Sequence, residues 1–67
     1  MTIDQIKERI EEIRSLVGDP EAAHSKEDDL YRDFIRYVAL GSGGISIVVK
    51  ARLVLTVIDI KFPRWHA

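Results

Sequence analysis

The chain has 67 residues, of which 46% are hydrophobic and 31% are charged, and its formal net charge is −1. This length allows one small domain, residues 1–67, and such a domain buries only about 60% of the surface that its unfolded chain exposes. The absence of cysteine excludes disulfides and thiolate metal sites, and the charge balance lacks the basic excess typical of a nucleic-acid binder. We therefore expect stability to come from helix packing or from self-association.

The charge is unevenly distributed along the chain. Residues 1–29 hold nine acidic and four basic side chains, whereas residues 30–67 hold two acidic and six basic ones. One interpretation is that the two halves pack together with complementary charge. The other is that the second half presents a basic surface to a partner.

The first element is predicted to be an amphipathic helix that ends at Gly18, a residue typical of helix C-termini. Thr2 can cap its N-terminus, with Gln5 three residues later in the position of a capping box. Apolar residues recur at spacings of three and four, which gives one apolar stripe. The stripe consists of Ile3, Ile6, Ile10, Ile13 and Val17.

A second helix is predicted from Pro20 to Leu40. Asp19 is suited to cap it, and proline is favoured at the first helical position. A further start signal at Ser25 leaves open a break near His24. The glycine-rich residues 41–44 end the helix. Its apolar stripe is expected to comprise Leu30, Tyr31, Phe34, Tyr37 and Val38.

Residues 45–60 can be interpreted as a helix or as a strand. Eleven of these sixteen residues are apolar, and every odd position from Ile45 to Val57 is apolar, which is typical of a strand. A strand of this length would be unusually long, and no other segment offers itself as a pairing partner. We therefore predict a helix, and keep as the alternative an α+β fold in which residues 45–58 form a strand that pairs with another chain.

The helical interpretation leaves many apolar residues away from the main apolar face. That face would comprise Ile47, Val48, Ala51, Val54, Leu55 and Ile58. Ile45, Val49, Leu53, Val57 and Ile60 would then lie largely off it. So much apolar surface predicts a self-associating or partner-binding face in residues 45–60.

The sequence argues against membrane insertion and secretion. The N-terminus is amphipathic and acidic, unlike a signal peptide. Residues 45–60 are too short to span a bilayer comfortably, and Lys50, Arg52 and Asp59 interrupt them. We expect a cytoplasmic protein without a membrane partner.

The last residues predict an extended aromatic tail. Pro63 keeps Phe62 extended, so the preceding helix must end before it. Phe62 and Trp65 are expected to anchor the tail over the helices, and the alternative is a tail that binds an external partner.

Catalytic and metal chemistry find little support. Glu21 and His24 are three residues apart, with Asp28 one turn further, a spacing used in di-metal bundles that draw ligands from four helices. A second histidine could come only from His66. Ser25 follows His24, but neighbours on a helix point about 100° apart, so no nucleophile–base pair is indicated. The sequence predicts no enzyme, no cofactor and no metal site.

A nucleic-acid partner is not expected either. A helix-turn-helix could be formed by the second and third elements, but its recognition helix would offer only Lys50 and Arg52 among aliphatic residues.

Two segments carry a resemblance: residues 19–31, DPEAAHSKEDDLY, and residues 58–67, IDIKFPRWHA. They resemble a group of short bacterial proteins with a DPEAAHSxEDxLY helix start and an IDFxRWxA-like C-terminus, for which no activity is known. The resemblance covers about a third of the chain and implies a helical third segment, although the β-branched run departs from the group. It also implies that the tail docks onto the start of the second helix, as a clasp or a binding site. The residues concerned are His24, Glu27, Asp28, Arg64 and Trp65.

Together these observations predict an all-α three-helix bundle with an extended aromatic tail, acting as a non-enzymatic interaction or accessory module. A homo-oligomer or another protein is the expected partner. The predicted partner-binding residues are Val49, Leu53, Val57, Ile60, Arg64 and Trp65. The alternative function is a small-ligand or metal-binding domain with its site near His24, Asp28 and residues 64–66.

Overall fold

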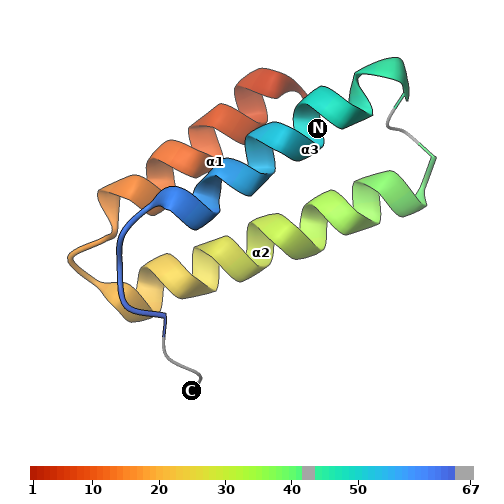
Figure 1. The fold of residues 1–67 in the computed structure, drawn as a ribbon. Coiled ribbons are helices and arrows are strands. Elements are labelled where there is room, and N and C mark those ends of the chain that lie inside the picture. Colours follow the sequence, from red (N-terminus) through yellow and green to blue (C-terminus); the bar gives the residue numbers. More distant parts are fainter. Residues whose placement is uncertain (42–43, 65–67) are drawn as a thin grey trace.

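The computed structural model, described for residues 1–41 and 44–64, is an all-α arrangement of three helices (Figure 1). Within these residues there is no strand, so the all-α prediction is confirmed and the strand alternative for residues 45–58 is wrong. The elements are α1 (Ile3–Ser15), α2 (Pro20–Ala39), the 3₁₀ turn η1 (Gly44–Ser46), α3 (Ile47–Leu55) and the 3₁₀ turn η2 (Thr56–Asp59).

The helix starts follow from their capping residues. The Thr2 hydroxyl accepts from the Gln5 amide at 3.1 Å, and the Gln5 side chain accepts from the Thr2 amide at 2.8 Å, so the predicted capping box is present. Asp19 accepts from the Ala22 amide at 3.3 Å, with Pro20 at the first helical position. α2 continues through Ser25 without a break, because a favourable cap residue inside a helix does not by itself interrupt the backbone ladder.

α1 ends earlier than predicted. Its last helical residue is Ser15 and its C-cap is Leu16, not the region of Gly18. The Leu16 amide bonds to the Ile13 carbonyl at 3.0 Å, so a tight final turn satisfies the helix end without a left-handed glycine. Val17, predicted to complete the apolar stripe, is consequently exposed.

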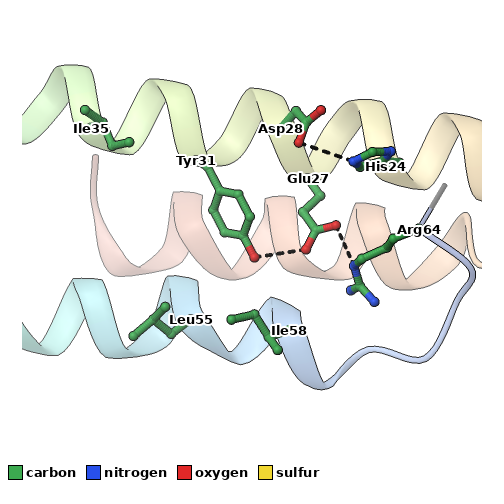
Figure 2. Close-up of a pocket in the computed structure, with 8 residues that line it drawn as sticks. All are labelled: His24, Glu27, Asp28, Tyr31, Ile35, Leu55, Ile58 and Arg64. Atoms are coloured by element: carbon green, nitrogen blue, oxygen red, sulfur yellow. Dashed lines mark hydrogen bonds and ion pairs between the residues drawn. The ribbon is translucent and has the colours of Figure 1, made fainter. Parts of the chain in front are cut away.

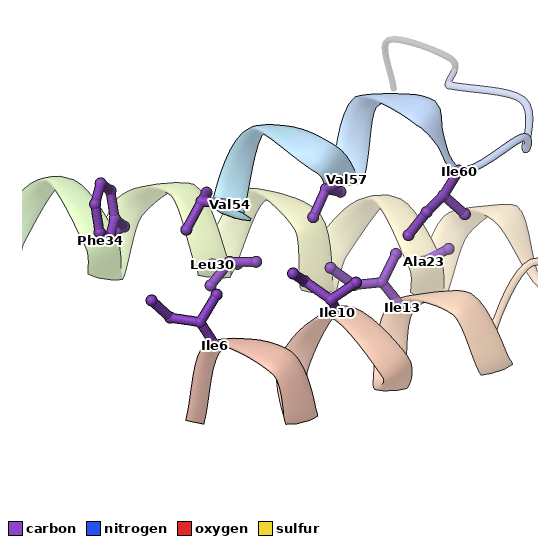
Figure 3. Packing of buried hydrophobic residues seen from close by; sticks show 9 residues of the cluster. All are labelled: Ile6, Ile10, Ile13, Ala23, Leu30, Phe34, Val54, Val57 and Ile60. Carbon is purple, nitrogen blue, oxygen red and sulfur yellow. The ribbon is translucent and has the colours of Figure 1, made fainter. Parts of the chain in front are cut away.

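The helices are arranged up, down and up, with α1 and α3 pointing the same way and α2 running opposite (Figure 1). α1 packs against both other helices, while α2 and α3 meet along a shorter line. Figure 3 shows the shared core, to which every helix contributes. Its buried residues are Ile6, Ile10, Ile13, Ala23, Leu30, Phe34, Val54, Val57 and Ile60.

The buried face of residues 47–60 differs from the predicted one. Val54, Val57 and Ile60 are 4%, 0% and 5% exposed, whereas Leu55 and Ile58 are 56% and 61% exposed. The reason is that α3 gives way to the 3₁₀ turn η2 at Thr56. Three residues per turn place positions i and i+3 on the same side. The 3.6-residue wheel therefore placed Val54 on the buried face correctly, but it misplaced Val57, Ile60, Leu55 and Ile58.

The sequence explains this tightening. Thr56, Val57 and Ile58 are three successive β-branched residues, which fit an α-helix less well than unbranched ones. The Thr56 hydroxyl donates to the Leu53 carbonyl at 2.7 Å and thereby competes with the backbone ladder. None of the helices described here is both long and apolar enough to cross a membrane.

One ion pair fixes α1 against α2. Arg9 donates to Asp33 at 2.9 Å, and this hydrogen bond holds the pKa of the Asp33 carboxyl below its ordinary value. A lowered pKa stabilises the folded chain above the ordinary carboxyl pKa, and the contribution is lost as the pH falls through the folded value.

The burial pattern of η2 predicts opposite outcomes for two neighbouring truncations. Val57→Ala should lower the free energy of unfolding by about 2 kcal/mol, because it opens a void in the core. The matched change Ile58→Ala should cost less than about 1 kcal/mol, because that side chain is mostly exposed. Urea denaturation at low protein concentration measures both, and a larger cost for Ile58→Ala would contradict the 3₁₀ turn.

Candidate functional site

A groove lies between α2 and the α3–η2 segment, with a volume of about 660 Å³. Figure 2 shows α2 forming one wall and α3 with η2 the other, while α1 lies behind them. Eight residues line it: His24, Glu27, Asp28, Tyr31 and Ile35 from α2, Leu55 and Ile58 from α3 and η2, and Arg64 from the segment that follows.

One end of the groove is apolar. Ile35 on α2 is 67% exposed, and Leu55 lies across from it on the opposite wall, while Ile58 lies further along that wall, opposite Tyr31 and Glu27 (Figure 2). Leu55 and Ile58 share this wall because residues three apart lie on one side of a helical segment. Large apolar side chains exposed together on one surface are typical of an interaction site.

The other end is polar and centres on Glu27, whose side chain is 4% exposed. The Tyr31 hydroxyl donates to one carboxylate oxygen at 2.9 Å, and Arg64 Nε donates to the other at 2.8 Å. A buried carboxylate needs an opposite charge or several donors to offset its lost hydration. Here it has both, so Glu27 joins the end of the described chain to the middle of α2.

Arg64 is held by contacts beyond the ion pair. Its Nη2 donates to the Val57 carbonyl at 3.0 Å, and its Nη1 approaches the Phe62 carbonyl at 3.4 Å. The guanidinium also stacks over the Phe62 ring, 3.8 Å from the centroid. Arginine suits this position because its planar fork of donors can serve several acceptors at once.

The Tyr31 hydroxyl is electrostatically perturbed. Burial, the hydrogen bond to the Glu27 carboxylate and the charge of that carboxylate raise the pKa of Tyr31 to about 12. Ionisation would place two negative charges side by side, so the neutral phenol is favoured in the folded chain.

His24 and Asp28 lie one turn apart on the rim of the groove. Nε2 of His24 lies 3.5 Å from a carboxylate oxygen of Asp28. No group of three or more histidine, aspartate or glutamate side chains is placed to hold a metal ion within residues 1–41 and 44–64. Across the same residues, no buried side-chain polar atom lacks a hydrogen-bond partner that a ligand would have to supply.

The residues predicted to bind a partner do not share one surface. Val57 and Ile60 are buried inside this chain, so their predicted position off the apolar face is wrong. Leu53 is half-buried and lines a shallow hollow against Ile10 and Arg14 of α1. Val49 is exposed, and helical geometry places it about 120° from Leu55.

Of the remaining predicted residues, Arg64 lies in the groove and contacts Glu27, while His24 and Asp28 line the same concavity. Trp65 and His66 lie outside the described residues. The sequence did not predict the whole apolar end of the groove. Ile35 was not expected in the site, although it follows Tyr31 by four residues and therefore shares its side of α2.

Comparison of the chain with models of protein families, with curated proteins and with solved structures gives no match. The functional interpretation therefore depends on the geometry of the groove and on its chemistry.

Removing the arginine from the polar end should destabilise the fold. Arg64→Ala leaves the Glu27 carboxylate buried with only Tyr31 as a donor, so the free energy of unfolding should fall by about 1–3 kcal/mol. Urea denaturation at neutral pH measures this loss. The control is Lys61→Ala, an exposed neighbour that should change stability by less than about 0.5 kcal/mol. Equal effects of the two variants would show that the Glu27–Arg64 ion pair does not stabilise the fold.

The raised pKa of Tyr31 predicts a loss of stability at alkaline pH. Below pH 10 the phenol is neutral in both states, and between about 10 and about 12 it ionises only in the unfolded chain. The stabilising contribution is therefore present below pH 10 and is lost as the pH rises through the folded pKa. Over this interval Tyr31→Phe should lose less stability than the original chain, as measured by urea denaturation at each pH. If the free energy of unfolding fell equally with pH in both chains, the raised pKa of Tyr31 would be contradicted.

Proposed function

We propose that this protein is a non-enzymatic interaction module that self-associates through the groove between α2 and α3. The observation that carries the proposal is the exposure of three large apolar side chains that line the groove, Leu55 and Ile58 on one wall and Ile35 on the other (Figure 2). A domain with so small a core gains stability when such side chains are covered by a partner.

Helix pairs bind other helices by accepting side chains between them. The groove offers a similar site to an incoming chain. Its two walls are antiparallel helical segments (Figure 1), and Ile35, Leu55 and Ile58 are among the side chains that line them. Two copies that pack these faces together would bury Leu55 and Ile58 of both chains in one layer of four helical segments. An interface of this kind uses the same surface of each subunit.

The contacts at the polar end favour a role in stabilising the fold over a role in binding a ligand. Both oxygens of Glu27 and most donors of Arg64 already have partners within the chain. The alternative, a small-ligand or metal site near His24 and Asp28, has only one histidine–carboxylate pair at 3.5 Å to support it. A ligand of that kind would have to displace contacts that stabilise the fold.

The test is the oligomeric state of matched variants. The original chain should associate at high concentration, while Leu55→Asp and Ile58→Asp should weaken association at least about tenfold, since each places a charge in the apolar layer. Sedimentation velocity over a range of concentrations measures the change.

The matched control is Val49→Asp. Val49 and Leu55 are both 56% exposed, yet only Leu55 lines the groove. The control should associate like the original chain and unfold at the same urea concentration. A monomeric original chain at every concentration would overturn the proposal, and equal weakening by Val49→Asp would move the interface to another face.

A further inference from the structure

Four exposed aliphatic side chains gather at the end of the bundle where α2 leads into α3. Val38 and Leu40 are exposed at the end of α2, and Val48 and Val49 are exposed in the first turn of α3. Leu40, at 75%, is the most exposed large hydrophobic residue in the described part of the chain. We call these four residues the aliphatic tip, and none of them lines the groove.

The aliphatic tip projects beyond the start of α1 (Figure 1). α1 has 13 residues and α2 has 20, which corresponds to lengths of about 20 Å and about 30 Å at 1.5 Å per residue. The longer helix therefore carries the tip away from the packed centre of the bundle. Large apolar side chains that remain exposed together are typical of a surface that another body covers.

Two arginines lie one helical turn behind the tip. Arg36 precedes Leu40 by four residues, and Arg52 follows Val48 by four. Each arginine therefore lies on the same side of its helix as one residue of the tip, about 6 Å further from the end. Both arginines are exposed, and among the ion pairs of the described residues neither takes part in one.

The segment that carries the tip contains no acidic residue. From Phe34 to Ile58 the chain has three basic side chains and no aspartate or glutamate. The third basic residue, Lys50, donates to the Tyr37 hydroxyl at 2.7 Å. Asp33, which precedes the segment, already lies in ion pairs, and Asp4 in the first turn of α1 lies behind the tip. The basic surface expected from the charge distribution is therefore found next to the most exposed apolar residues.

We infer that the aliphatic tip binds the surface of an anionic lipid bilayer, with its side chains among the upper parts of the acyl chains. Arg36 and Arg52 then lie level with the phosphate groups. The chemistry along the bundle axis, apolar at the end and cationic one turn behind it, follows the order of a bilayer from acyl chains to headgroups. Arginine suits this depth because its apolar stem lies along hydrocarbon while its charge reaches the headgroups.

Such a contact needs no helix that spans the bilayer. It therefore differs from the membrane insertion that the sequence argues against, although it replaces the expectation of no membrane partner. A protein partner fits this surface less well, because a projecting end would require a matching acidic hollow in that protein. The inference does not depend on self-association, since the groove is lined by other residues.

Sedimentation with two kinds of lipid vesicle tests the inference. One kind contains phosphatidylcholine alone, and the other includes about 30% phosphatidylserine. The original chain should bind the anionic vesicles at least about tenfold more tightly than the neutral ones, and raised salt should weaken that binding. Binding to neither kind of vesicle, or equal binding to both, would overturn the inference.

Two variants locate the contact. Val49→Asp places a charge among the acyl chains, and the pair Arg36→Glu with Arg52→Glu replaces attraction to the headgroups by repulsion. Each should weaken binding to the anionic vesicles at least about tenfold. All the changed side chains are exposed, so both variants should unfold at the same urea concentration as the original chain.

Matched controls make the same changes away from the tip. Val17→Asp alters an exposed valine between α1 and α2, at the opposite end of the bundle (Figure 1). The pair Lys26→Glu with Lys61→Glu alters charge equally on exposed residues outside the tip. Both controls should bind to within about threefold of the original chain, since charges beyond a Debye length are screened. Equal weakening by the controls would show that the tip is not the contact.

A second copy of the chain is the remaining candidate for covering the tip. Sedimentation velocity without vesicles distinguishes it, because Val49→Asp should then leave self-association unchanged. If Val49→Asp weakened self-association, the tip would be assigned to a second copy and the membrane contact would be wrong. If the original chain bound anionic vesicles but stayed monomeric, the groove proposal would fail while the membrane contact stood.

Discussion

The structure depends on the change from the α-helix to the 3₁₀ turn between Leu55 and Thr56. This change aligns Val54, Val57 and Ile60 on one side, where they close the core against α1 and α2. It also aligns Leu55 with Ile58 on another side, where they form one wall of the groove. In a continuous α-helix each step of three residues would rotate the side chain by about 60°, so Val54, Val57 and Ile60 would be less closely aligned than they are in the 3₁₀ turn.

The same turn supports the polar end of the groove. It brings the Val57 carbonyl within 3.0 Å of Arg64, while Arg64 in turn neutralises the buried Glu27 carboxylate of α2. Removing a buried carboxylate from water is costly unless it gains a counter-charge. The ion pair therefore links a residue of α2 to one that follows it by 37 positions, and it fixes the chain after η2 against the helix pair that forms the groove.

The sequence predicted the parts of the fold that local rules determine. The capping box at Thr2 and the Asp19-Pro20 helix start follow from short-range chemistry. The helical state of residues 47–55 was predicted from the unusual length of a strand there and the lack of a pairing segment, against the local alternation. The face of η2 did not follow, because a 3.6-residue period was applied to a segment with three residues per turn. The partners of Glu27 were not predictable from spacing either. In the sequence Glu27 looks like one of three exposed acidic residues at positions 27–29, and only tertiary packing buries it.

The exposed apolar wall and the buried ion pair impose different demands on the chain. Leu55 and Ile58 gain from being covered, whereas Glu27 and Arg64 already satisfy each other without a second chain. The polar end can therefore hold the two walls in place within the single chain, so in the self-association proposed above a second copy would not need to order the groove itself. Less ordering on binding leaves more of the apolar burial as affinity. A single buried carboxylate and one short 3₁₀ turn thus fix the groove that we propose as the docking surface.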